Sequence, residues 1–252
     1  MRIRLIRHAT LRVEVGGLQV LVDPQLDPAR ARPAVANSPN DRRNPLVELP
    51  EPAHSIAAEI DGVLVTHLHA DHLDATAVEV LPKEVAVLCQ PPDATALRER
   101  GFVDVRPVEA TLDWCALRVT RTNGRHGTGE IGERMAPVSG FVITTPGEST
   151  LYIAGDTIWC NEVREAIDRH HPDIIVANAG GARFLEGDPI TMTADDVVAL
   201  ARHATGARIV AVHLEAVNHC LEARTGLRTR LEHEQLQERV SVLDDGEELQ
   251  LF

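Results

Sequence analysis

The sequence has few cysteines and no long apolar run. Its four cysteines, Cys89, Cys115, Cys160 and Cys220, are scattered and form no C-x-x-C pair, so neither a disulfide framework nor a zinc ribbon is indicated. No apolar run approaches the ~20 residues that span a bilayer. Four arginines interrupt the apolar residues of "MRIRLIRHATLRV", unlike a secretory signal. We expect a cytoplasmic protein with reduced thiols and no membrane partner.

Positive charge is also scarce. The 252 residues include 25 Lys and Arg against 38 Asp and Glu, which gives a formal net charge of -13. A negative field of this size repels phosphate backbones and anionic membranes. Nucleic acid is therefore an unlikely partner, and a small-molecule substrate is favoured. A local basic pocket is still compatible with this net charge.

The chain is 44% hydrophobic, which suffices for a sizeable core. Strand-forming segments come early in each half, and strand–helix units follow. Residues 3–15 and 18–24 are rich in β-forming residues around Gly16-Gly17, which predicts a hairpin. The order predicts an α+β fold in a single domain, 1–252, with two packed sheets and helices outside. Further strands are predicted at 62–66, 84–89, 102–108, 115–122, 138–145, 149–156, 173–179 and 207–213, and helices at 73–81, 93–101, 160–171, 191–204 and 221–232.

The stretch from Pro24 to Pro52 contains seven prolines, both ends included, and no periodic pattern. Long irregular loops of this kind are uncommon inside compact domains and tend to be functional or disordered. We expect residues 27–52 either to cover the site as a lid, or to form a solvated surface loop or a contact in a homo-oligomer. As a lid, the stretch would offer an anionic substrate its four arginines: Arg30, Arg32, Arg42 and Arg43.

The most informative motif is "THLHADHLD", which follows the apolar segment 63–65. His67 lies at the end of the predicted strand, where ligand sites collect in sheet-containing folds. His69, two residues on, can project to the same side of an extended segment. Asp71 and His72 then lie on the turn into the next helix. Imidazoles and carboxylates are ligands that divalent transition metals prefer. We therefore predict metal binding here rather than a loop of solvated histidines.

Three more candidate ligands lie at similar positions later in the chain. His126 is in a glycine-rich loop after a strand, and Asp156 and His213 each end an apolar strand. Taken singly, each has a simpler interpretation: a turn residue, a helix N-cap and a core histidine. Their joint occurrence in this order favours a shared site.

With these motifs the chain resembles the metallo-β-lactamase superfamily of metal-dependent hydrolases. The resemblance covers nearly the whole length, with five motifs in order: Asp23 in "VLVDP", "HLHADH", His126, Asp156 and His213. It implies a four-layer αββα sandwich. The segment "RHATLRVEVGGLQVLVDP" is similar to the lactonase-like branch that contains L-ascorbate-6-phosphate lactonase and N-acylphosphatidylethanolamine phospholipase D, although Arg7 replaces that branch's glycine.

The same resemblance implies a site for two divalent metal ions. His67, His69 and His126 would hold the first metal, and the second would be held by Asp71, His72 and His213. Asp156 would bridge both metals. A hydroxide held between the metals would attack the carbon of a carbonyl group or the phosphorus of a phosphoryl group. Asp71 would also carry the proton to the leaving group. Zn²⁺ suits a histidine-rich set without thiolates, and Mn²⁺, Fe²⁺ and Ni²⁺ suit mixed His/Asp sites.

Three further residues have a proposed role beside the metals. Asp23 is expected to orient a ligand histidine, or else only to start an Asp-Pro turn. His8, placed in the first strand, would face the site and touch substrate or Asp156, or would be a plain strand histidine. His219 would act as a proton donor in the pocket, or would have no role at the start of a helix.

The leading hypothesis is thus a binuclear metallohydrolase that acts on a small lactone, ester, amide or phosphodiester, anionic substrates included. A nuclease or phosphodiesterase is the alternative within hydrolysis, but the acidic chain disfavours it. An iron-dependent redox enzyme and a non-catalytic metal-binding scaffold are the other two classes considered.

Overall fold

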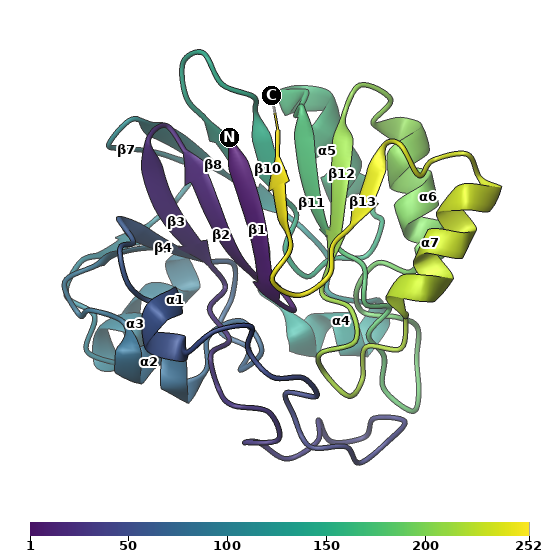
Figure 1. Ribbon diagram of the computed structural model, residues 1–252, viewed down its shortest axis with the longest axis horizontal. Helices are drawn as coiled ribbons and strands as arrows, with labels where there is room; N and C mark the ends of the chain where they lie inside the picture. Colours follow the sequence, from purple (N-terminus) through teal and green to yellow (C-terminus); the bar gives the residue numbers. More distant parts are fainter. Residues whose placement is uncertain (252) are drawn as a thin grey trace.

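The computed structural model describes residues 1–251, which form two seven-stranded sheets packed against each other (Figure 1). The first sheet has the order β14-β1-β2-β3-β4-β5-β6. Its strands are β1 (Arg2–Arg7), β2 (Thr10–Val15), β3 (Leu18–Val22), β4 (Gly62–Val65), β5 (Ala86–Cys89), β6 (Val105–Pro107) and β14 (Glu248–Gln250).

The second sheet has the order β13-β12-β11-β10-β9-β8-β7. It is antiparallel from β7 to β10 and parallel from β10 to β13. Its strands are β7 (Thr111–Trp114), β8 (Leu117–Asn123), β9 (Ser139–Thr144), β10 (Leu151–Ile153), β11 (Ile174–Asn178), β12 (Arg208–Val212) and β13 (Val240–Val242).

Helices cover the outer face of each sheet (Figure 1). The first sheet carries α1 (Ala53–Ile56), α2 (Ala75–Val80), the 3-10 helix η1 (Pro91–Asp93) and α3 (Ala94–Glu99), and the second carries α5 (Asn161–His170), α6 (Ala194–His203) and α7 (Arg224–His233). A further helix, α4 (Gly129–Met135), lies at one end of the sandwich. The predicted αββα arrangement is confirmed.

Apolar side chains from alternate strand positions fill the space between the sheets. Ile3 and Leu5 of β1 meet Phe141 and Ile143 of β9 in one buried cluster. This spacing of two puts each pair on the same face of its strand. Every residue of β4 is buried because the strand is covered on both faces, by the other sheet and by helices. Burial of each such side chain stabilises the fold by ~1.5–3 kcal/mol.

The amino-terminal segment differs from its prediction. Residues 3–15 form two antiparallel strands, β1 and β2, and not one run. His8 lies in the turn between them with a φ of 61°, so its placement in the first strand was wrong. The pairing shifts register between Leu5 and Arg7, and this irregularity turns the chain where the composition alone shows an unbroken β pattern. The hairpin at Gly16-Gly17 joins β2 to β3 as predicted.

Most other predicted strands and helices are present with ends shifted by one to three residues. A capping box starts α6, since the Thr193 side chain accepts from the Asp196 backbone N–H and the Asp196 carboxylate accepts from the Thr193 backbone N–H. Short elements were missed: α1, α4, β7, β13 and β14. Across residues 1–251 the structure has no helix that is both long and apolar enough to cross a membrane.

Candidate metal centre

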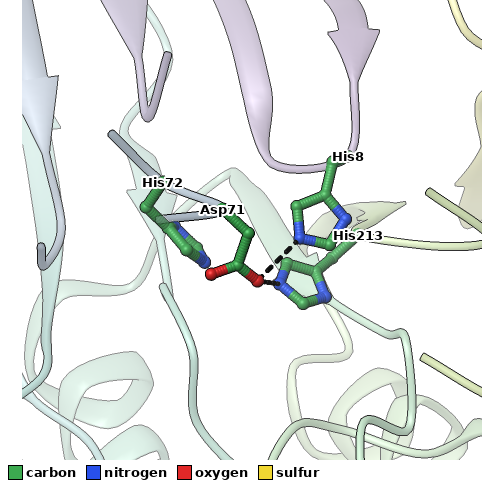
Figure 2. A group of neighbouring side chains, drawn as sticks. All are labelled: His8, Asp71, His72 and His213. Carbon is green, nitrogen blue, oxygen red and sulfur yellow. Dashed lines mark hydrogen bonds and ion pairs between the residues drawn. The ribbon is translucent and has the colours of Figure 1, made fainter. Parts of the chain in front are cut away.

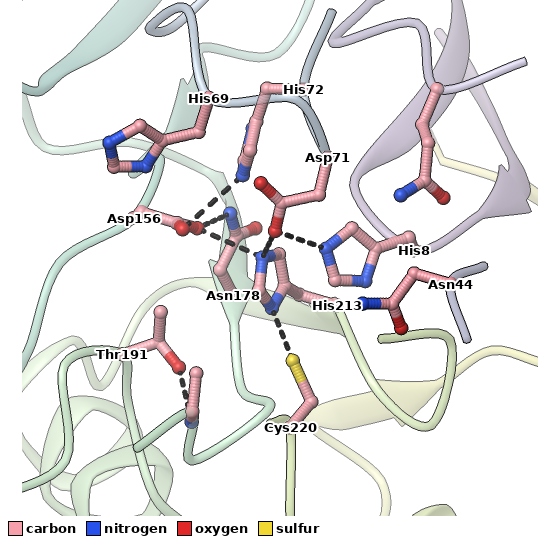
Figure 3. A network of polar contacts seen from close by, with 12 residues as sticks. His8, Asn44, His69, Asp71, His72, Asp156, Asn178, Thr191, His213 and Cys220 are labelled. Atoms are coloured by element: carbon pink, nitrogen blue, oxygen red, sulfur yellow. Dashed lines mark hydrogen bonds and ion pairs between the residues drawn. The ribbon is translucent and has the colours of Figure 1, made fainter. Parts of the chain in front are cut away.

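Loops that follow four strands meet at one end of the sandwich. β4, β8, β10 and β12 lead into the loops that carry His67, His126, Asp156 and His213. β8, β10 and β12 run in the same direction within one sheet, so their carboxyl ends share an edge. The cluster after β4 faces this edge from the other sheet. Figure 3 shows the resulting convergence of imidazoles and carboxylates.

The turn from β4 into α2 holds four of the candidate ligands within six residues. The backbone N–H groups of His72 and Leu73 both donate to the His69 carbonyl, at 2.9 and 3.0 Å. The Asp74 carboxylate caps α2 by accepting from the Ala77 N–H at 2.8 Å. The tight turn therefore fixes the backbone from which the ligands project.

His67, His69 and His126 form one potential ligand group. Each offers a ring nitrogen, and these three nitrogens all lie within 4.8 Å of one another. His67 Nε2 is 2.9 Å from His69 Nδ1. His67 and His126 are buried, whereas His69 is half-buried. Three imidazole nitrogens at this separation match a three-histidine metal site.

A second group combines His8, Asp71, His72 and His213, again with one ligand atom each within 4.8 Å (Figure 2). Asp71 Oδ2 is 3.2 Å from His8 Nε2 and 3.8 Å from His213 Nε2. The rings of His8 and His213 lie against each other, with centroids 3.6 Å apart. His8 faces the site as expected, but its side chain contacts Asp71 and not Asp156.

Asp156 lies between the two groups. Its Oδ2 is 3.3 Å from His72 Nε2 and 3.4 Å from His126 Nε2, while its Oδ1 is 3.2 Å from His213 Nε2. Asn178 donates to Oδ1 at 2.6 Å. One carboxylate thus faces histidines of both groups, an arrangement suited to bridging two cations.

Besides His8 Nδ1 and His219 Nδ1, two buried ring nitrogens that face Asp156 have no hydrogen-bond partner among the described residues: His72 Nε2 and His213 Nε2. Leaving buried polar atoms unpaired is costly. Both atoms point at Asp156 oxygens without hydrogen-bond geometry, whereas bound metals would satisfy the nitrogens and the carboxylate together. The donor set therefore fits divalent transition metals.

Neighbouring groups hold the candidate ligands in orientation. Asp23 Oδ2 accepts from His72 Nδ1 at 2.8 Å, and both Asp23 oxygens accept from Thr66, each at 2.7 Å. His126 Nδ1 lies 2.8 Å from the Ile190 carbonyl. Ligating histidines commonly donate their second N–H in this way. The geometry agrees with the orienting role predicted for Asp23.

Both central carboxyls favour the ionised form. Burial opposes ionisation of Asp156, but His213 and His72 more than offset it and hold its pKa well below the usual range. Burial likewise opposes ionisation of Asp71, but the hydrogen bond from His8 and the charge of His72 hold its pKa well below the usual range. One buried and one partly exposed carboxylate here attract cations.

The surroundings shift the pKa values of His72 and His67 in opposite directions. Burial disfavours the His72 cation, but Asp156 and Asp23 on either side raise the pKa of His72 well above its usual value. Burial and the nearby His72 lower the pKa of His67 well below its usual value. A metal at His72 would displace its proton, because a ligating imidazole nitrogen is unprotonated.

A cavity of about 380 Å³ opens onto the cluster, and we call it the site cavity. His69, Asp71, His126 and Asp156 line its polar side together with His219. Its other walls are mostly apolar and come from the proline-rich stretch, the turn after β4, the end of α4 and the loops after β11 and β12: Arg32, Pro33, Ala34, Val35, Asn44, Ala70, Met135, Phe184 and Val217. Residues 32–35 and 44 place the proline-rich stretch at the rim of the site; whether it moves as a lid stays a prediction.

Residues 19–214 match the beta-lactamase superfamily domain. The chain belongs to this superfamily. It is 35% identical to the UPF0173 protein YddR of Bacillus subtilis, over 98% of each chain. It is 31% identical to a UPF0173 metal-dependent hydrolase of Methanoculleus marisnigri, over 71% of this chain and 82% of the relative. The crystal structure of an isothiocyanate hydrolase from Delia radicum gut bacteria has a TM-score of 0.95 and 33% identity, covering 100% of this chain and 99% of that one.

The superfamily membership predicted from the motifs is thereby confirmed, and the chain is a metal-dependent hydrolase of that superfamily. The closer resemblance to the lactonase-like branch stays a prediction. The structure brings all seven predicted ligands together, six of them in the two groups and Asp156 between the groups: His67, His69, Asp71, His72, His126, Asp156 and His213. Their individual roles as metal ligands stay predictions.

Several residues at the site were not identified from the sequence. Asn178 ends β11 and donates to Asp156, and Cys220 Sγ lies 3.5 Å from His213 Nδ1. Met135 and Phe184 line the site cavity. Asn178 follows a buried strand, the same signal that marked Asp156 and His213, and could have been found by it. The other three carry no distinctive pattern, because their positions depend on how loops pack.

Proposed function

We propose that this protein is a binuclear metallohydrolase that acts on a small organic substrate. The main observation in support of this proposal is the pair of ligand groups that meet at Asp156. His72 Nε2 and His213 Nε2 lie beside Asp156, buried and without a hydrogen-bond partner. His67, His69 and His126 would hold one metal, and Asp71, His72 and His213 the other. Zn²⁺ is the first choice because the set is rich in imidazole and contains no thiolate.

Two divalent metals bound there would supply a hydroxide nucleophile at neutral pH and polarise the bond to be broken. Asp71 lines the site cavity, where its carboxylate would be placed to accept a proton from the nucleophile and return it to the leaving group. His8 donates to Asp71 at 3.2 Å and keeps that carboxylate aimed at the cavity. The apolar walls limit water around the reacting atoms.

Isothiocyanates are the first substrate class to test. The support is the isothiocyanate hydrolase that shares 33% identity and nearly full coverage with this chain, together with the apolar site cavity. Hydrolysis of R–N=C=S forms a bond from a water oxygen to the central carbon, and a thiocarbamate results. The C–N bond then breaks as nitrogen takes a proton, which gives R–NH₂ and O=C=S without any change of oxidation state.

Turnover assays on reconstituted protein test this proposal. We expect amine release from an isothiocyanate to exceed release from matched lactones, esters, amides and phosphodiesters, and to stop when a chelator removes the metal. Preferred turnover of a phosphodiester would favour the nuclease alternative. Bound iron with oxygen consumption would favour the redox class, and full metal loading without turnover of any substrate would favour the scaffold.

A further inference from the structure

A larger cavity adjoins the site cavity. Its volume is about 690 Å³, and we call it the outer cavity. Met135 and Phe184 line both cavities, so the two spaces border each other at these side chains. A substrate held at the candidate metal centre can therefore extend beyond Phe184 and Met135 into a second space. Both volumes lie in the range typical of small-molecule sites.

The walls of the outer cavity combine apolar and charged side chains. Ile131, Met135, Phe184 and Leu185 provide apolar surface. Leu185 is 69% exposed, and it is one of only three large apolar side chains among residues 1–251 that are exposed to solvent. An exposed leucine at the wall of a cavity is the kind of apolar surface that a ligand covers.

Hydrogen bonds and ring packing hold these walls in place. The Leu185 N–H donates to the Asn37 carbonyl at 2.7 Å, and Thr128 Oγ1 donates to Asp188 at 3.0 Å across the base of α4. The Phe184 ring stacks on His219, with centroids 6.1 Å apart and planes inclined by 29°. The outer cavity is thus formed before any ligand arrives, which lowers the entropy cost of binding.

The charges at this cavity select against an anion. Glu130 and Glu186 line it against a single cation, Arg134, and the whole chain carries a net charge of -13. An uncharged group gains from the apolar wall without meeting this negative potential.

We propose that the outer cavity binds the uncharged, apolar substituent of the substrate, and that Leu185 helps to set the preference for long or aromatic substituents over short ones. This inference rests on the proposed function and deepens it. It assigns the substrate class as alkyl or arylalkyl compounds whose reactive carbon lies at the metal centre.

The test compares 2-phenylethyl isothiocyanate with methyl isothiocyanate in wild type and in Leu185→Asp. We expect the wild-type ratio of kcat/KM to favour the phenylethyl compound by about tenfold or more, because the ring buries apolar area, and we expect Leu185→Asp to lower that ratio by about tenfold. Val103→Asp is the matched control, since Val103 is 72% exposed and lines neither cavity. An unchanged ratio in Leu185→Asp would overturn the inference.

A binding measurement separates this inference from the proposed function. N-(2-phenylethyl)acetamide and N-methylacetamide are titrated into metal-free protein by NMR. Tighter binding of the phenylethyl amide, weakened by Leu185→Asp and not by Val103→Asp, supports the outer cavity even if no isothiocyanate is hydrolysed. Equal binding of both amides would overturn it whatever the enzyme hydrolyses.

Discussion

Asp71 differs from the other candidate ligands in having two tasks. Its carboxylate faces His213 in the second ligand group and also lines the site cavity. His8 contacts the same oxygen from a strained turn position, with a φ of 61°. Non-glycine residues rarely adopt such a φ, and they cluster at functional sites when they do. Residue-scale tests should therefore separate metal binding from proton transfer.

Asp71→Asn keeps the shape of the side chain and removes its basicity. We expect kcat to fall by about 100-fold or more, with metal content largely retained, because the remaining ligands are intact. Kinetics and metal analysis on the same sample check this. Asp41→Asn, at an exposed position, is the control. Unchanged turnover on a verified substrate would exclude Asp71 as the proton carrier.

Asp23 acts through His72 and touches no cavity. Replacing it with Asn weakens the hydrogen bond at His72 Nδ1, which is now 2.8 Å long. We expect zinc affinity to fall by ~10–100-fold, measured by competition with a chromophoric chelator. Asn also tolerates the positive φ of 44° at this position. Wild-type affinity in Asp23→Asn would show that the contact is not needed to orient the ligand.

The proline-rich stretch has no regular secondary structure, but side-chain hydrogen bonds hold it in place. Asn218 accepts from the Val35 N–H at 2.9 Å and from Asn44 Nδ2 at 2.7 Å, and it donates to the Asn40 carbonyl at 2.9 Å. Arg7 is fully buried and donates to the Val47 carbonyl at 3.0 Å. These bonds tie one wall of the site cavity to loops of both sheets.

Asn218→Ala removes several of these buried bonds at once. Each contributes ~0.5–1.5 kcal/mol net, so we expect faster amide hydrogen exchange in residues 33–44, with the sheets unaffected. Mass-spectrometric exchange measures this. Asn161→Ala, at an exposed helix start, should leave exchange in residues 33–44 unchanged. Unaltered protection in Asn218→Ala would mean that other contacts hold the wall.

At the scale of strands and helices, the features that depend on a local sequence pattern could be predicted from the sequence. The strand ends that carry His67, Asp156 and His213 follow from apolar runs with a polar residue behind them. The turn at His8 did not follow, because β-forming residues flank it on both sides and the register shift is a tertiary feature. α4 and Phe184 were missed because loop packing, and not periodicity, places them.

The whole molecule keeps an unusual number of histidines away from water. Burial lowers the pKa of His8 to about 3 and that of His126 to about 4. It also lowers the pKa of His67 and His219. Burial also disfavours the His72 cation, but Asp156 and Asp23 outweigh it and raise the pKa of His72. Burial therefore favours the neutral, metal-binding form of the four imidazoles with lowered pKa values.

This imbalance sets the pH dependence of the metal-free protein. In the unfolded chain all five histidines take up protons as pH falls through about 6.5. In the folded chain the lowered pKa values of four of them oppose this uptake, while His72, with its raised pKa, binds its proton at a higher pH. Unfolding is therefore accompanied by net proton uptake. The free energy of unfolding should decrease as the pH is lowered from 7 to 5. Urea midpoints at the two pH values test this, and an equal or higher midpoint at pH 5 would contradict it.

The central claim is that the sandwich end holds two metal ions in joined groups. The most direct measurement is metal content per chain by inductively coupled plasma mass spectrometry, on protein purified without a chelating tag and reconstituted with zinc. The account predicts about two equivalents, since two ligand groups meet at Asp156. A single equivalent would contradict the binuclear site, and no bound metal after reconstitution would contradict the metal centre itself.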